Sequence, residues 1–213
     1  MKTHAIRELI AKARLHEEQS SALARFLSNK IPELHRAIKL PATGAGKALT
    51  EFVIAYIEQV PDVLEAAAEV AREAGIEDVI NPVLMISEHL LLQPLDSEEA
   101  REGLVSWLGE AYLAHRLVEE VNDRYITHLG RPLIPLDTTR ANLIAHYLIG
   151  EAFANPLDRT VEATLKEMIT AIDFQPASVQ TFRERLSSPN IHNAWQRWPC
   201  MSRTLGIDLN LTS

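Results

Sequence analysis

The sequence contains a single cysteine, Cys200, among its 213 residues. One cysteine cannot form an intramolecular disulfide, which excludes the small secreted folds that depend on a disulfide framework. The N-terminus also lacks a signal-peptide pattern, because charged residues such as Lys2, Arg7 and Lys12 interrupt it every few positions. These two absences predict a protein of the reducing cytoplasm.

Long apolar runs are missing as well. The most apolar stretch, residues 83–92, contains Glu88 and His89 and is too short to span a bilayer. Basic residues are also scarce, since the formal net charge is −8, whereas a nucleic-acid-binding surface must be basic. We therefore expect neither a membrane nor a nucleic acid as a partner.

The charge that is present is distributed unevenly. Residues 1–50 carry nine basic and four acidic residues, while residues 51–110 carry two basic and fourteen acidic residues. One interpretation is that the basic first helices pack against the acidic middle of the same molecule. The other is that the acidic face of residues 51–110 docks a basic protein partner or a second copy of the chain, with Glu51, Glu58, Glu65 and Glu69 as its exposed stripe.

One short segment resembles a nucleotide-binding motif. Residues 42–47, Ala-Thr-Gly-Ala-Gly-Lys, are similar to part of the phosphate-binding loop of nucleotide hydrolases. That loop needs a small residue at its start and a Ser or Thr after the lysine, and it follows a strand. Pro41 and Ala48 occupy those two positions and no strand pattern precedes them. We therefore expect no nucleotide cofactor.

Apolar residues recur at three- and four-residue steps through most of the chain, which predicts helices and no convincing strand. Thr3 is expected to cap the first helix, Pro61 to kink or split the third, and Gly75 to end it. The predicted helices span residues 3–30, 33–40, 48–74, 77–92, 96–129, 137–154, 155–173 and 178–187.

These helices predict one all-α domain over residues 1–213, built as a bundle of about seven to eight helices. The irregular tail, residues 189–213, contains Trp195 and Trp198, and we expect it to pack as a strap across the bundle, because exposed tryptophans are costly. A ferritin-like or a haem-oxygenase-like layout would satisfy this pattern of helices.

The helix predicted over residues 96–129 carries polar residues on its apolar face. His115 and Asn122 lie within a stripe of apolar residues at helical spacing, and Glu119 lies beside them. A buried imidazole, carboxylate or amide must find a hydrogen-bonding partner. The pattern therefore predicts a buried polar site on this helix.

Other predicted helices bring further polar residues toward the same interior. Glu17 continues the apolar stripe of the first helix with His16 at its edge, and His146 and Glu151 fall on the helix predicted over residues 137–154. Helical bundles build metal sites in this way, and imidazole with carboxylate suits iron, manganese or zinc. We predict Glu17, His115, Glu119 and His146 as ligands of a metal ion, with His16, Asn122 and Glu151 around them or in contact with a small molecule.

Two families of helical proteins bear on this prediction. Ferritin-like metal proteins carry Glu-x-x-His on two helices, whereas this sequence has no Glu-x-x-His, and His115-x-x-x-Glu119 reverses the order. A first helix with a histidine resembles the start of haem-oxygenase-like proteins, which would imply His16 as the proximal ligand.

Two functions remain open from the sequence. The first is a buried His/Glu site for a metal ion or small ligand, with redox chemistry as one use of it. The second is a non-enzymatic interaction or oligomerisation module that uses the acidic face. The polar groups could also simply pair with one another, and the sequence identifies no reaction or substrate.

Overall fold

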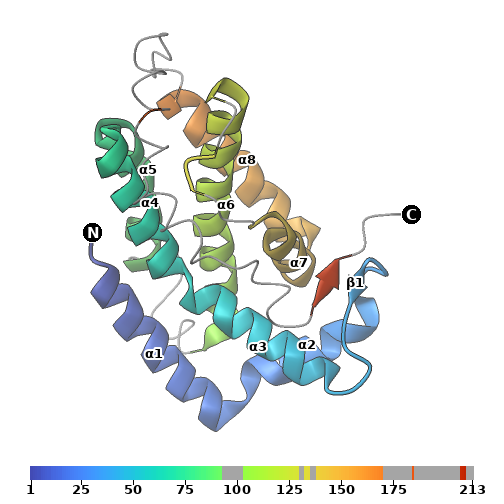
Figure 1. Ribbon diagram of the computed structural model, residues 1–213. Coiled ribbons are helices and arrows are strands. Elements are labelled where there is room, and N and C mark those ends of the chain that lie inside the picture. Colours follow the sequence, from blue (N-terminus) through green and yellow to red (C-terminus); the bar gives the residue numbers. More distant parts are fainter. Residues whose placement is uncertain (93–102, 130–131, 135–137, 170–183, 185–206, 210–213) are drawn as a thin grey trace.

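The computed structural model is a bundle of α-helices (Figure 1). It describes residues 1–92, 103–129, 132–134, 138–169, 184 and 207–209. The α-helices of these residues are α1 (Thr3–Ser20), α2 (Ala22–Lys30), α3 (Ala45–Glu58), α4 (Val60–Ala74), α5 (Glu77–Leu92), α6 (Leu104–Leu129), α7 (Thr139–Ile149) and α8 (Glu151–Ile169). The predicted all-α class is confirmed.

Helix α6 is the centre of the bundle and contacts every other α-helix (Figure 1). Its buried side chains accordingly lie on more than one face. They include Trp107, Leu113 and Leu117 as well as Leu104, Leu108, Ala111, Val118 and Tyr125. A helix surrounded by other helices is buried on most sides, so polar residues on those sides are buried too. His115, Glu119 and Asn122 are buried as expected.

One hydrophobic cluster joins these helices and extends from Ile6 to Ile207. Tyr56, Trp107, Tyr112 and Tyr125 are among its largest fully buried side chains. Burying such apolar surface is the main favourable contribution to folding. No helix in the described part of the chain is long and apolar enough to cross a membrane.

The first predicted helix is in fact two helices, because the chain breaks at Ser21. Ser21 adopts a left-handed conformation, with φ 51° and ψ 31°, between α1 and α2. The buried carboxylate of Glu17 then accepts hydrogen bonds from the backbone N–H groups of Leu23 (2.7 Å) and Ala24 (3.2 Å). The first N–H groups of a helix have no intrahelical acceptor, so Glu17 supplies what the start of α2 lacks.

We expect Glu17→Ala to lower the free energy of unfolding by about 1–3 kcal/mol, because it leaves two backbone donors at the start of α2 without an acceptor. Urea denaturation followed by circular dichroism measures this change. The neighbouring exposed residue provides the control, since Glu18→Ala should change stability by less than about 0.5 kcal/mol. Equal effects of the two substitutions would contradict the capping role of Glu17.

Two other local predictions about the first half of the chain are wrong. Thr3 is the first residue of α1 and donates its hydroxyl to Glu65 Oε1 at 2.5 Å, so it does not cap the helix. The helix predicted over residues 33–40 is not present either, since residues 34–40 are not helical. A 3-10 turn, η1 (Ile31–Glu33), is followed by a two-residue strand, β1 (Ile38–Lys39), which pairs antiparallel with β2 (Asp208–Leu209).

The breaks at Pro61 and Gly75 follow the prediction. The chain splits between α3 and α4 next to Pro61, and Gly75 ends α4 with φ 68°. The α7–α8 junction lies earlier than predicted, at Gly150, whose φ of 91° suits glycine, whereas Pro156 falls inside α8. The predicted start of a helix at Asp96, the helix over residues 178–187, and Trp195, Trp198 and Cys200 lie outside the described residues.

The acidic residues predicted as an exposed stripe are paired within the molecule. Glu65 accepts hydrogen bonds from Arg7 of α1, and Glu58 pairs with Arg14, which also lies on α1. Glu51 and Glu69 pair with Lys47 and Arg72 on their own helices. Hydrogen bonds from Arg7 and Thr3 lower the pKa of Glu65 to about 2. The basic first helix therefore packs against acidic residues of α3 and α4, as the intramolecular interpretation predicts.

Candidate functional site: a polar pocket between α6, α7 and α8

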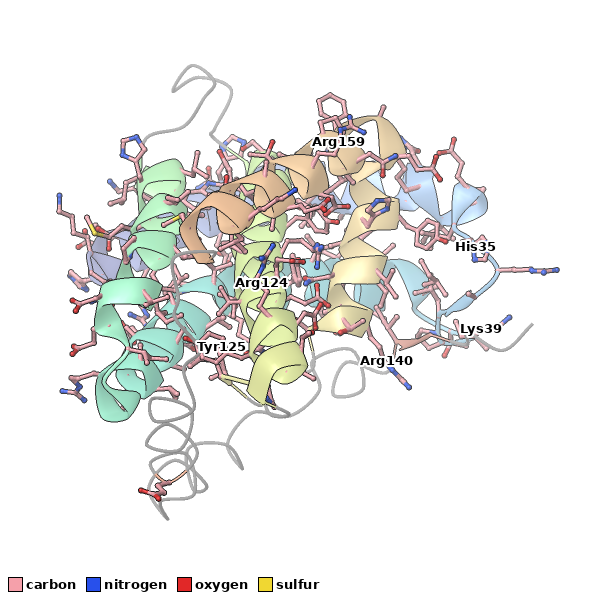
Figure 2. All side chains as sticks on the ribbon, turned by 90° about the horizontal axis from the view of Figure 1, so that it is seen from above. His35, Lys39, Arg124, Tyr125, Arg140 and Arg159 are labelled. Carbon is pink, nitrogen blue, oxygen red and sulfur yellow. The ribbon has the colours of Figure 1, made fainter. Side chains whose placement is uncertain are left out.

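A pocket of about 390 Å³ lies between α6, α7 and α8. Figure 2 shows α6 (yellow-green) beside α7 and α8 (tan and orange), with side-chain oxygen and nitrogen atoms gathered between them. The residues that line it sit at helical spacing on one face of each helix: Tyr112, Arg116 and Glu119 of α6; Thr139, Asn142, Leu143, His146 and Tyr147 of α7; Glu151 and Asp158 of α8.

Arg116 joins two carboxylates at the wall of the pocket. Its Nη1 donates to Glu119 Oε2 at 2.5 Å, and its Nε donates to Asp158 Oδ1 at 3.0 Å. Burial works against the guanidinium charge, but the charges and hydrogen bonds of Glu119 and Asp158 outweigh it and raise the pKa of Arg116. Arg116 is therefore a fixed cation that holds α6 and α8 together.

Glu119 is connected in turn to α7 and α3. Asn142 Nδ2 donates to Glu119 Oε2 at 2.6 Å, and Tyr56 Oη donates to Asn142 Oδ1 at 2.6 Å. Burial is the largest cause that raises the pKa of Tyr56, so its hydroxyl stays protonated and can donate. This chain of hydrogen bonds fixes the orientation of the Asn142 amide and of the Glu119 carboxylate.

Asp158 is contacted by Tyr112 and His146 on the other side of the pocket. Tyr112 Oη donates to Asp158 Oδ1 at 2.7 Å, and burial raises the pKa of Tyr112, which keeps this hydroxyl a donor. His146 Nε2 lies 3.6 Å from Asp158 Oδ2 and 3.2 Å from Asn155 Oδ1. The ring of His146 also meets that of Tyr112 edge-on, with centroids 6.0 Å apart.

His115 lies behind this network and does not line the pocket. Its Nε2 is 2.8 Å from the carbonyl oxygen of Tyr56, and its ring lies against the Tyr56 ring at 4.3 Å between centroids. Tyr56 is in the last turn of α3, where carbonyl groups lack an intrahelical donor, so we assign the proton of His115 to Nε2. Burial lowers the pKa of His115 to about 4, which leaves the ring neutral near pH 7.

The predicted site residues do not all come together. Glu119, His146 and Glu151 line the pocket, whereas Glu17 binds the start of α2 and His115 binds Tyr56. His16 is half-buried beside Gly103. Asn122 holds the 132–134 segment through Ile134, donating to its carbonyl oxygen at 2.8 Å and accepting from its N–H at 2.9 Å. Among the described residues, no group of three or more His, Cys, Asp or Glu side chains could hold a metal ion.

Arg116, Asp158 and Tyr112 form the centre of the site, although none of them is among the residues predicted from the sequence. Arg116 could have been found, because it lies three residues before Glu119 on the same helix face and can pair with it. Asp158 gave no such signal. It is 42 residues from Arg116 along the chain, and only the packing of α8 on α6 brings the two together.

Comparison of the chain with protein-family models, curated proteins and solved structures found no match. Neither the ferritin-like nor the haem-oxygenase-like layout therefore receives support from a matched structure. Function must therefore be inferred from the chemistry of the pocket itself.

Proposed function

We propose that this protein binds a small organic molecule that carries an ammonium group, in the pocket between α6, α7 and α8. The observation that carries this proposal is the charge of the pocket lining. Arg116 faces two carboxylates, Glu119 and Asp158, and Glu151 adds a third at the start of α8. The fixed cation is outnumbered, so a positively charged ligand would be attracted and a simple anion repelled.

Aromatic side chains in the lining support the same class of ligand. Tyr112 and Tyr147 both border the pocket, and the faces of tyrosine rings attract ammonium groups. The polar network also supports a preorganised site, because Tyr56, Asn142 and Tyr112 already fix the two inner carboxylates. A ligand would therefore meet oriented acceptors without having to order them.

The two functions left open by the sequence have less support. Glu17 and His115 are engaged with α2 and Tyr56, so only Glu119 and His146 of the proposed metal ligands line the pocket. The acidic residues 51, 58, 65 and 69 each have a cationic partner in the same molecule, which weakens the case for a charge-driven docking surface. Elemental analysis that found stoichiometric iron, manganese or zinc would restore the metal hypothesis.

Titration calorimetry with butylamine at low ionic strength tests the proposal. We expect saturable binding to the native protein and an affinity at least about tenfold lower for Asp158→Asn, which removes one inner charge but keeps an acceptor for Tyr112 and Arg116. Asp78→Asn, an exposed position on α5, should bind like the native protein. Absence of saturable amine binding, or equal binding by Asp158→Asn, would reject the proposed function.

A further inference from the structure

Half of the residues that line the pocket come from α7. The five lining residues on that helix run from Thr139 to Tyr147, and the last four lie three, four, seven and eight residues after Thr139. This spacing keeps them on one face over about 12 Å of helix. The lining therefore offers an extended ligand contacts along about 12 Å of α7.

The carboxylates are spread along this length. Glu119 accepts a hydrogen bond from Asn142, near the first turn of α7. Asp158 lies 3.6 Å from His146, near the last turn of that helix. Glu151 begins α8 directly after Gly150, and it lies seven residues before Asp158 on the same helix. Seven residues are close to two turns, so these two residues share a face of α8 and are about 10 Å apart along its axis.

The three carboxylates of the pocket differ in whether a cation is paired with them. Arg116 pairs with both Glu119 and Asp158, whereas Glu151 is exposed and forms no ion pair with any residue in the described ranges. Tyr147 follows His146 on α7, so it provides aromatic surface between the level of Asp158 and Glu151, whereas Leu143 lies one turn back, next to Asn142. Acceptors separated by apolar surface match a chain of methylene groups with charged ends.

Tyr147 is held in place although it is 38% exposed. Its ring stacks on that of His35, with centroids 5.2 Å apart and planes inclined by 10°, and His35 comes from the segment between η1 and β1. Figure 2 shows His35 beside α7. An exposed aromatic ring fixed from outside gives the pocket a preformed wall near Glu151.

We infer that the ligand is a linear polyamine, an alkyl chain with an ammonium group at each end. One ammonium group binds at Asp158, the other binds at Glu151, and the methylene chain between them lies against Tyr147. This inference rests on the proposed function and narrows it, because a ligand with one ammonium group would need only the inner carboxylates. The same surface would disfavour a compact or anionic ligand.

The test compares butylamine, putrescine and spermidine by titration calorimetry on the native protein, Glu151→Gln and Glu162→Gln. Glu162 is the matched control, because it is exposed on α8 and does not line the pocket. We expect spermidine to bind the native protein at least about tenfold more tightly than butylamine. Glu151→Gln should weaken spermidine about fivefold and butylamine less than about twofold, and Glu162→Gln should weaken neither.

The outcomes separate this inference from the proposed function. If butylamine binds but spermidine binds no more tightly, or if Glu151→Gln and Glu162→Gln affect spermidine equally, the polyamine inference is overturned and the amine site remains. If none of the three amines binds, both fail. Binding of one spermidine per molecule, weakened more than butylamine binding by Glu151→Gln, supports both the proposed function and the polyamine inference.

Discussion

Replacing Arg116 with alanine is expected to lower the free energy of unfolding by about 3 kcal/mol. The substitution leaves Glu119 and Asp158 facing each other in a largely buried setting, without the guanidinium that now binds both. Removing one partner of a buried ion pair is far more costly than the net value of the pair, because the remaining charge stays desolvated. Urea denaturation at pH 7 measures the loss.

Two further variants identify the cause of that loss. Arg159→Ala removes an arginine from α8 without touching the pocket and should cost less than about 0.5 kcal/mol. Arg116→Lys keeps the charge but cannot bond to both carboxylates with a planar group. Its free energy of unfolding should therefore lie between those of the native protein and Arg116→Ala. A loss below about 1 kcal/mol for Arg116→Ala would show that the two carboxylates do not depend on it.

Lowering the pH from 7 to 4 is expected to cost about 3 kcal/mol of stability through His115 alone. Burial lowers the pKa of His115 from 6.5 to about 4 in the folded protein. Between these values the unfolded chain binds a proton that the folded protein does not, so acid favours unfolding. The contribution of His115 is fully present above pH 6.5 and is lost as the pH falls toward 4.

The substitution His115→Gln isolates this contribution. Glutamine can still donate a hydrogen bond toward the carbonyl of Tyr56 but does not titrate. The stability of the His115→Gln protein should therefore fall less steeply between pH 6.5 and 4.5 than that of the native protein. The exposed residue His4 is the control, since His4→Gln should leave the native slope unchanged. Parallel slopes for native protein and His115→Gln would contradict a buried neutral His115.

Much of the helical framework could be predicted from the sequence. The bounds of α5, the split at Pro61 and the end of α4 at Gly75 follow from local chemistry that acts within a few residues. The break at Ser21 has no such local signal. It is accompanied by the capping of α2 by Glu17, a contact that forms only after the chain has turned.

The site was predictable only in part, for a related reason. Patterns on α6 correctly indicated that His115, Glu119 and Asn122 are buried, because burial follows from the apolar face of one helix. What each of them binds depends on other helices: Tyr56 of α3, Asn142 of α7 and Ile134 after α6. Because these partners lie on different parts of the chain, the predicted metal ligands do not come together. The centre of the pocket is formed by Arg116 and Asp158 instead.

The most direct test of the account is to map amine binding on the protein by NMR. Titration of isotope-labelled protein with spermidine should shift the signals of Tyr112, Leu143, His146 and Tyr147 together and saturate at one ligand per molecule, while signals of α1 and α4 stay unchanged. Shifts that do not saturate, or that follow the acidic residues 51, 58, 65 and 69 instead, would contradict a specific amine site between α6, α7 and α8.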